Sequence, residues 1–231
     1  GAGNDNLSGG DGRDWLIGGT GDDLLDGSGG IASTQGPGDL IRPGLGADTI
    51  IGHQQYFDSG GEGAVLSYSD IASSFGGVSI TVTEDATSSG TVVGLLDPST
   101  NGGQQSPFVD DKFTFVRFFQ GSAGTDVIRG GLTSQTGFAG LAGDDTLYGG
   151  TSNFDFLQYN DDQYELGGNG AVAVNFETGS AIDGFGNTDT FFSMEQVRGT
   201  PYSDTFIGSA NNERMFAMEG NDTLTGGAGN D

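Results

Sequence analysis

The sequence predicts an all-β fold, a solenoid in which short parallel strands stack coil upon coil. Two observations support this prediction. The chain has 46 glycines among 231 residues and 25 aspartates against 7 glutamates, and Gly and Asp favour turns over helix and strand interiors. Both residues also recur together in a nine-residue pattern, which leaves room for one turn and one short strand in each repeat. The sequence therefore predicts a succession of similar turn–strand units.

The nine-residue pattern is clearest over residues 1–26. Three aspartates there lie nine residues apart, each followed by a leucine two positions later, namely Asp5, Asp14 and Asp23. The pattern slips over residues 27–33, where Ala32 stands at the position expected for an aspartate. It resumes in several further runs, whose in-phase acidic residues are Asp39, Asp48, Asp126, Asp145, Asp204, Glu213, Asp222 and Asp231, with a weaker echo at Asp155.

Each repeat can be understood from its residue types. Glycines at the first, second and fourth positions allow positive φ, and the aspartate at the sixth position closes the turn with a carboxylate. The last three residues form a strand whose middle side chain points inward. Two units complete an 18-residue coil, so alternate turns stack on the same side. The sequence therefore predicts that Asp5 faces Asp23 and that Asp204 faces Asp222.

The formal net charge of −25 at pH 7 excludes some partners and favours others. One lysine, Lys112, and six arginines cannot neutralise nucleic-acid phosphates. No apolar run approaches the roughly 20 residues of a membrane span, and the absence of cysteine excludes disulfides and thiolate metal sites. Stacked turns that present carbonyls and carboxylates suit Ca²⁺ better than Mg²⁺, which demands tight octahedral geometry. We therefore expect several calcium ions as cofactors.

Catalytic signatures are missing from the sequence. The chain has no H-E-x-x-H motif, no G-x-S-x-G motif and no cysteine nucleophile. Its one histidine, His53, lies in a polar segment, where a surface position is the usual role. Acidic residues are so numerous that no glycosidase-like carboxylate pair stands out. We expect no enzyme activity within these residues.

The pattern G-G-x-G-x-D-x-U-x resembles the calcium-binding nonapeptide of the RTX (repeats-in-toxin, haemolysin-type) family. The resemblance is carried by residues 1–26, 34–51, 121–129, 140–148 and 199–231. It implies a right-handed parallel β-roll with longer-turn inserted coils, secreted or displayed at the cell surface, commonly by type I secretion. The implied role is a structural module that folds on binding calcium outside the cell.

The resemblance also implies which residues bind the ions. A first site would use Gly1, Gly3, Asp5, Gly18, Thr20 and Asp23. A second would use Gly10, Gly12 and Asp14 with Gly27 and Gly29, where Ala32 removes one carboxylate. A third would join Gly19, Gly21 and Asp23 to Gly36 and Asp39. The remaining ligands carried over are Asp48, Gly124, Asp126, Gly140, Gly143, Asp145, Asp204, Gly220, Asp222 and Asp231.

Two inserts interrupt the repeats and resemble each other. We divide the chain into repeat runs over 1–51, 121–158 and 199–231 and inserts over 52–120 and 159–198, all within one continuous solenoid. The segment 66–70 resembles 157–161 at an offset of 91, and 111–130 matches 189–208 at an offset of 78. Two separate small domains are the less favoured interpretation, because each copy is too short for its own core.

Aromatic residues gather in these inserts, and they leave the function open. Large rings would fill the wider interior of longer coils, or they would form an exposed patch for a partner or glycan. A carbohydrate- or partner-binding module, or an appendage of a secreted polysaccharide-modifying enzyme, is therefore the alternative function. Residues 227–231 repeat residues 1–5. The chain is therefore expected to be either a piece of a longer roll or a unit that associates end to end, in which case Glu213 and Asp231 would share an ion with the next unit.

Overall fold

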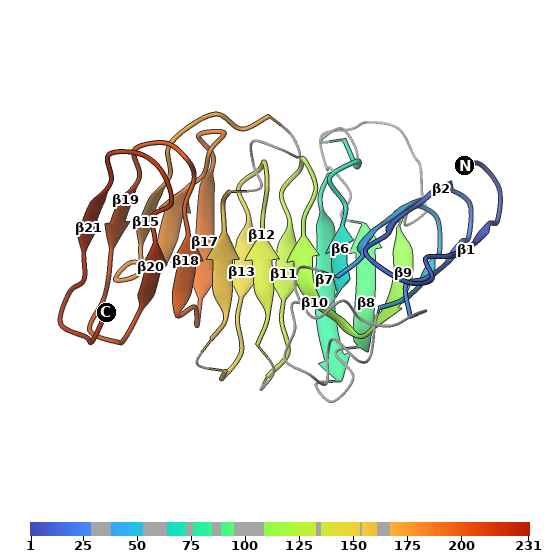
Figure 1. Cartoon of the computed structure of the whole chain (residues 1–231), viewed down its shortest axis with the longest axis horizontal. Coiled ribbons are helices and arrows are strands. Elements are labelled where there is room, and N and C mark those ends of the chain that lie inside the picture. Colours follow the sequence, from blue (N-terminus) through green and yellow to red (C-terminus); the bar gives the residue numbers. More distant parts are fainter. Residues whose placement is uncertain are drawn as a thin grey trace.

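The computed structural model describes residues 1–28, 38–52, 64–72, 76–84, 89–94, 109–132, 135–152, 154–160 and 167–231. In these residues every regular element is a β-strand, and the strands form two sheets that run the length of the molecule (Figure 1). Over the same residues we find no helix of the length and apolarity that a membrane span requires. The sequence prediction of an all-β parallel solenoid is confirmed.

One sheet has eight strands, all parallel, which follow one another in chain order. Its strands are β2 (Trp15–Thr20), β4 (Leu40–Leu45), β6 (Ala64–Ser67), β10 (Val116–Gln120), β12 (Gly137–Ala139), β14 (Phe156–Gln158), β18 (Gln196–Arg198) and β20 (Arg214–Phe216). The chain therefore returns to this sheet once in every coil.

The other sheet has thirteen strands, and its order departs from chain order at two places. In spatial order they are β1 (Asn6–Ser8), β3 (Leu24–Asp26), β5 (Thr49–Ile51), β9 (Asp110–Thr114), β8 (Ser89–Gly94), β7 (Val78–Glu84), β11 (Val127–Arg129), β13 (Thr146–Tyr148), β17 (Thr188–Phe192), β16 (Ser180–Ile182), β15 (Ala173–Asn175), β19 (Thr205–Ile207) and β21 (Thr223–Thr225).

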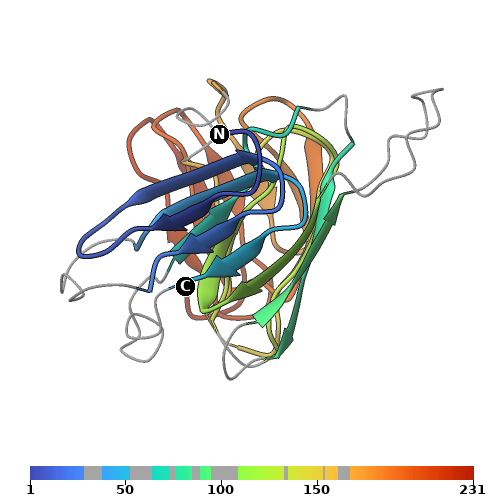
Figure 2. The same cartoon turned by 90° about the vertical axis from the view of Figure 1, so that its right-hand side faces the viewer.

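The core lies between the two sheets, which Figure 2 shows nearly end-on. In most of the three-residue strands the middle side chain is the buried one, as the period of two requires, although Leu224 in β21 is exposed. Leu16 and Ile41 from one sheet are buried in the same cluster as Leu25 and Ile50 from the other. The flanking side chains of the strands point outward, and Trp15 is 69% exposed. A stack of thin layers, each held by one or two apolar residues, thus forms a single elongated core.

The inserts continue the coil in the eight-stranded sheet but add antiparallel strands to the other. β7, β8 and β9 form one antiparallel meander, and β15, β16 and β17 form a second. In each meander the first strand pairs in parallel with the repeat strand that follows, β11 or β19. The last strand pairs with the repeat strand that precedes, β5 or β13. The relatedness of the two inserts is therefore visible in the fold, whereas the return strands β8 and β16 were not predicted.

The predicted pairing of turns is wrong across the slip that begins at residue 27. Asp14 N donates to Asp39 Oδ1 and Asp23 N donates to Asp48 Oδ1, each across 25 residues. Asp23 therefore meets Asp48 and not Asp39, whereas Asp14 meets Asp39; Ala32 lies outside the described residues. The reason is strand register: β2 pairs with β4 and β3 with β5. The extra residues lie between β3 and β4 and lengthen one coil without exchanging the two sides.

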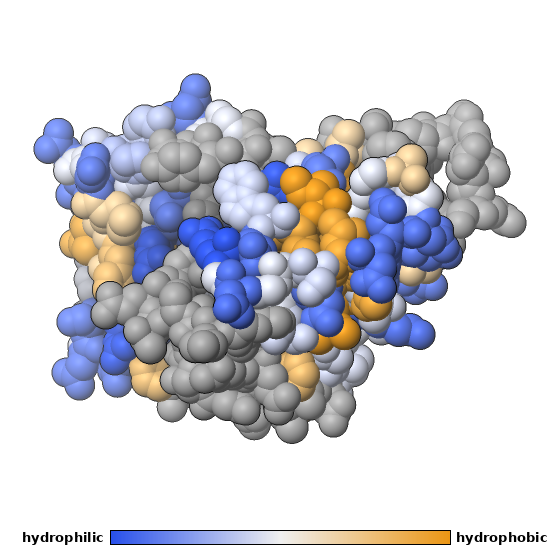
Figure 3. All heavy atoms as spheres, turned by 45° about the vertical axis from the view of Figure 1, so that its right-hand side comes forward, coloured by the Kyte–Doolittle hydropathy of each residue, from blue (hydrophilic) through white to orange (hydrophobic). Residues whose placement is uncertain are grey.

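Large rings fill the interior at the inserts, as one of the two interpretations expects. Phe113 and Phe119 are buried and meet edge to face at 5.1 Å between ring centroids, and Phe191 packs against Phe176 in the same way. Other apolar side chains remain exposed, among them Phe154 and Phe192. Figure 3 shows an apolar band among hydrophilic side chains on one face of the molecule. The inserts therefore contribute aromatic rings both to the core and to the surface.

Candidate metal sites

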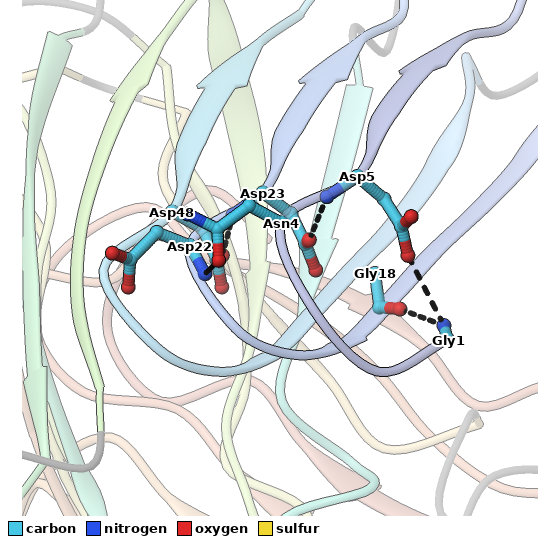
Figure 4. A network of polar contacts seen from close by, with 7 residues as sticks. All are labelled: Gly1, Asn4, Asp5, Gly18, Asp22, Asp23 and Asp48. Carbon is cyan, nitrogen blue, oxygen red and sulfur yellow. Dashed lines mark hydrogen bonds and ion pairs between the residues drawn. The ribbon is translucent and has the colours of Figure 1, made fainter.

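Carboxylates stack in ladders at the points where the turns enter the strands. Asp5 N donates to Asp23 Oδ1 at 2.7 Å, and Asp23 N donates to Asp48 Oδ1 at 2.7 Å (Figure 4). Asp48 N in turn donates to Asp111 Oδ1 at 2.8 Å. Each carboxylate thus uses one oxygen to bind the backbone of the preceding coil. The predicted pair of Asp5 and Asp23 is confirmed by this contact.

The same contact recurs along the rest of the roll. In the thirteen-stranded sheet the donor–acceptor pairs are Asp126–Asp145, Asp145–Asp189 and Asp204–Asp222. In the eight-stranded sheet they are Asp14–Asp39, Thr136–Asp155, Asp155–Glu195 and Glu213–Asp231. The predicted pair of Asp204 and Asp222 is therefore also confirmed. Each sheet carries its own row of acidic side chains at one end of its strands.

Glycine serves two different purposes in these turns. At the first position it makes room for the carboxylate, since a Cβ on Gly18 would collide with both Asp23 Oδ2 and Pro43 O. At the second and fourth positions it supplies positive φ, as at Gly19 (φ 116) and Gly21 (φ 118). Leu141 occupies a second position with φ 70, and a side chain there carries conformational strain.

In one class of turn, the second carboxylate oxygen is buried without a hydrogen-bond partner. This holds for the Oδ2 atoms of Asp14, Asp23, Asp48 and Asp145. We call these open turns. Burial raises the pKa of Asp48 to about 6, with the charge of Asp23 adding to the shift. Burial and the charge of Asp126 raise the pKa of Asp145 well above its ordinary value. Buried carboxylate oxygens of this kind are costly unless a cation or a donor reaches them.

In a second class of turn, a hydroxyl residue at the second position satisfies the carboxylate. Ser122 N donates to Asp126 Oδ2 at 2.5 Å and Ser122 Oγ to Asp126 Oδ1 at 2.9 Å. Thr200 binds Asp204 in the same way, at 2.7 Å through both its amide and its hydroxyl. Ser209 binds Glu213 through the same two groups. We call these closed turns, because the chain itself supplies both donors.

Several of these turns lie in segments that match a known family of repeats. The model of the RTX calcium-binding nonapeptide repeat matches four segments, residues 1–31, 118–132, 138–153 and 197–231. These segments of the chain are RTX calcium-binding nonapeptide repeats. No curated protein matches the chain in sequence. The RTX segments contain the turns of Asp14, Asp23 and Asp145, where a carboxylate oxygen has no partner. The turn of Asp48 lies outside these segments but has the same geometry.

The structure brings some of the predicted backbone ligands together and leaves others undecided. Gly1 O accepts a hydrogen bond from Thr20 N at 3.1 Å, and Thr20 O accepts one from Gly3 N at 2.7 Å. The Gly18 carbonyl lies against the N-terminal amine. These groups of the first predicted RTX site therefore do converge between two stacked turns. Gly29 and Gly36 lie outside the described residues. The assignment of each predicted residue as a calcium ligand stays a prediction.

Four acidic residues escaped the sequence prediction of the RTX sites, one of them Glu195, which accepts a hydrogen bond from Asp155 N in the ladder. Asp111 and Asp189 stand at equivalent places in the two inserts, and a buried tyrosine hydroxyl donates to each: Tyr68 to Asp111 at 2.5 Å and Tyr159 to Asp189 at 3.0 Å. Burial raises the pKa of both carboxyls to about 7. Their common offset of 78 residues marks them in the sequence, but no glycine pattern surrounds Asp111. The remaining residue, Asp183, lies in the loop between β16 and β17.

The side chains of the open turns fit a hard cation. In the described part of the chain no three acidic side chains converge on one point. An ion held here would therefore take carboxylate oxygens from few residues and the rest of its ligands from backbone carbonyls, a donor set made only of oxygen that suits Ca²⁺. The buried, unpartnered oxygens of Asp14, Asp23, Asp48 and Asp145 are the observation on which this fit rests.

Proposed function

We propose that this chain is a structural module of a secreted or cell-surface protein whose repeat turns fold around calcium ions. The observation that supports the proposal most is the set of buried carboxylate oxygens without partners in the open turns. At a formal charge of −25, neighbouring coils repel one another unless cations lie between them. Binding of Ca²⁺ to the folded turns alone would then stabilise the fold by linkage.

Secretion is part of the proposal because calcium is scarce in the cytosol and abundant outside the cell. Extracellular calcium modules have dissociation constants on the order of 10⁻⁴–10⁻³ M. A chain with sites of that strength stays unliganded in a low-calcium cytosol and becomes saturated outside the cell. The proposed role is therefore that of a rod or stalk which becomes rigid after export, without enzyme activity of its own.

Calcium binding is tested by direct titration of the whole chain. Isothermal titration with CaCl₂ should give several ions per chain, and the same titration with MgCl₂ should give weak or no heat. Replacement of the open-turn carboxylates by Asp14→Asn and Asp48→Asn should each reduce the number of ions or their affinity. Wild-type chain that binds no calcium at millimolar concentration would overturn the proposal.

A carbohydrate-binding role is the second candidate, favoured by one groove. The groove has a volume of about 1110 Å³, and Phe154, Gln196, Asn211 and Arg214 are among its lining residues. The ring of Phe154 is 43% exposed, and the Arg214 guanidinium lies 5.1 Å from its centroid. An aromatic face beside amide groups suits a sugar. Binding on a glycan array that disappears in Phe154→Ala supports this role, and no binding by the wild type contradicts it.

A further inference from the structure

The loop between β16 and β17, residues 183–187, takes the place of a repeat turn. It lies against the repeat turn 140–145: Asn187 Oδ1 accepts a hydrogen bond from Gly143 N at 3.2 Å, and Thr188 N donates to Asp144 Oδ1 at 2.7 Å. Asp145 N donates to Asp189 Oδ1 at 3.1 Å, which continues the carboxylate ladder. This loop belongs to none of the segments that the RTX repeat model matches.

Asp183 is the first residue of this loop. It is 1% exposed, and its Oδ1 accepts hydrogen bonds from Phe185 N at 2.9 Å and from Asn187 N at 2.7 Å. Its Oδ2 is buried and has no hydrogen-bond partner. The backbone therefore fixes one oxygen of the carboxylate and leaves the other unsatisfied, as in the open turns of the repeats.

The facing turn offers a second oxygen in the same condition. Asp145 is also 1% exposed, and its Oδ2 has no partner either. The two carboxylates belong to turns that are hydrogen-bonded to each other, through Gly143 N to Asn187 Oδ1 and Thr188 N to Asp144 Oδ1. Asp189 follows in the same ladder, since its Oδ1 accepts a hydrogen bond from Asp145 N. Buried carboxylate oxygens without donors, as on Asp183 and Asp145, are unfavourable in a folded chain unless a cation is present.

We propose that Asp183 and Asp145 together bind a calcium ion between the β16–β17 loop and the repeat turn 140–145. This site is made by a repeat turn and a loop that is not a repeat, and it rests on the proposed calcium-binding function. The ion fastens the second antiparallel meander to the preceding coil. It stands where the stack changes from parallel to antiparallel pairing, between β17 and β16.

The test is a count of bound calcium in Asp183→Asn. Asparagine keeps the Oδ1 acceptor for Phe185 N and Asn187 N and replaces only the unpartnered oxygen. The matched control is Asp155→Asn, since Asp155 is equally buried but each of its oxygens accepts a backbone N–H, from Thr136 and Gly150. After equilibrium dialysis in millimolar calcium, atomic emission should give one ion fewer per chain for Asp183→Asn than for wild type, and no loss for the control.

The possible outcomes separate this proposal from the proposed function. Equal counts in wild type and Asp183→Asn overturn the Asp183 site and leave calcium binding by the repeats intact. A wild-type chain without calcium overturns both. If Asp183→Asn does not fold, a wild-type crystal structure in calcium decides: an ion bonded to Asp183 Oδ2 supports the site, and any other occupant of that position overturns it.

Discussion

At the scale of single residues, a hydroxyl at the second position of a turn changes what its carboxylate needs. The turns of Asp14 and Asp23 have glycine at this position, and one oxygen of each carboxylate has no donor. A serine or threonine there, as at Ser122 and Thr200, supplies an amide and a hydroxyl to the carboxylate. In the proposed function a cation completes the first kind of turn, whereas the second kind already has its donors within the chain.

This difference predicts unequal effects of two isosteric substitutions. Asp23→Asn removes one negative charge from the contacts with both Asp5 and Asp48, so calcium affinity should fall by roughly tenfold, about 1.4 kcal/mol. Asp155→Asn should change calcium affinity little, because both oxygens of Asp155 already accept backbone hydrogen bonds. Calcium titrations of the two variants measure the difference. Equal losses would show that a carboxylate oxygen without a hydrogen-bond donor is no better a calcium ligand than one that has a donor.

The reverse change is predicted for a closed turn. Ser122→Gly removes the hydroxyl that Asp126 Oδ1 accepts, and it gives the second position the residue found in open turns. The calcium-free protein should lose about 0.5–1.5 kcal/mol of stability, the usual net value of one hydrogen bond, because Asp126 Oδ1 keeps Val78 N as a donor. The calcium-bound protein should lose less, if the ion replaces the missing donor. Denaturant titrations with and without calcium check this, and an identical loss in both conditions contradicts it.

At the scale of elements, the two inserts repeat one design. In each insert, a buried tyrosine at the end of a strand of the eight-stranded sheet contacts an aspartate of the thirteen-stranded sheet. The pairs are Tyr68 with Asp111 and Tyr159 with Asp189. The tyrosine hydroxyl donates a hydrogen bond to the carboxylate, as the serine hydroxyl does in the closed turns. The inserts therefore extend the roll through side-chain donors, without depending on glycine-rich turns.

The tyrosine hydroxyls should contribute measurably to stability. Tyr68→Phe leaves Asp111 Oδ2 without its donor in a buried site, so the free energy of unfolding should fall by about 1–3 kcal/mol. Tyr159→Phe should have a similar effect. The control is Tyr202→Phe, whose ring is 36% exposed and which should change stability little. Denaturant unfolding in saturating calcium measures all three, and a Tyr68→Phe value equal to that of the control would refute the assigned role.

Local repetition could be predicted from the sequence, and the longer-range arrangement could not. The two strands β1 and β3 keep their register over a coil of 18 residues, which places Asp5 against Asp23. Counting residues along the repeat was therefore sufficient to predict this pair. Counting failed at residue 27, because an added loop changes the length of a coil without changing its side. The strands β8 and β16 return antiparallel between strands far apart in the chain, which periodicity does not reveal. The sequence did contain a signal for the hydrogen bonds from Ser122 to Asp126, because a serine stands there at a position that is usually glycine.

At the scale of the whole molecule, the buried carboxylates make the calcium-free fold sensitive to pH. Burial raises the pKa of Asp48 to about 6 and that of Asp111 to about 7, both from 3.8. The folded state therefore binds more protons than the unfolded state between about pH 4 and 7. Since stability falls with pH wherever the folded state holds more protons, these groups favour folding fully below pH 3.8 and oppose it progressively up to neutral pH.

The calcium-free protein should consequently become more ordered on mild acidification. In calcium-free buffer, the β signal in circular dichroism and the thermal transition should both increase from pH 7.5 to pH 5. In calcium the trend should reverse, because protons compete with the ion for the same oxygens. A calcium-free protein that loses structure between pH 7.5 and pH 5 would contradict the burial of these carboxylates.

The central claim is that calcium ions complete this fold, and circular dichroism of the whole chain at pH 7.5 tests it most directly. In excess EGTA the spectrum should show little β structure and no cooperative thermal transition. Addition of free calcium to several millimolar should restore the β signal and a sharp transition, and magnesium at the same concentration should not. A β signal and a melting temperature that are the same in EGTA and in calcium would contradict the account.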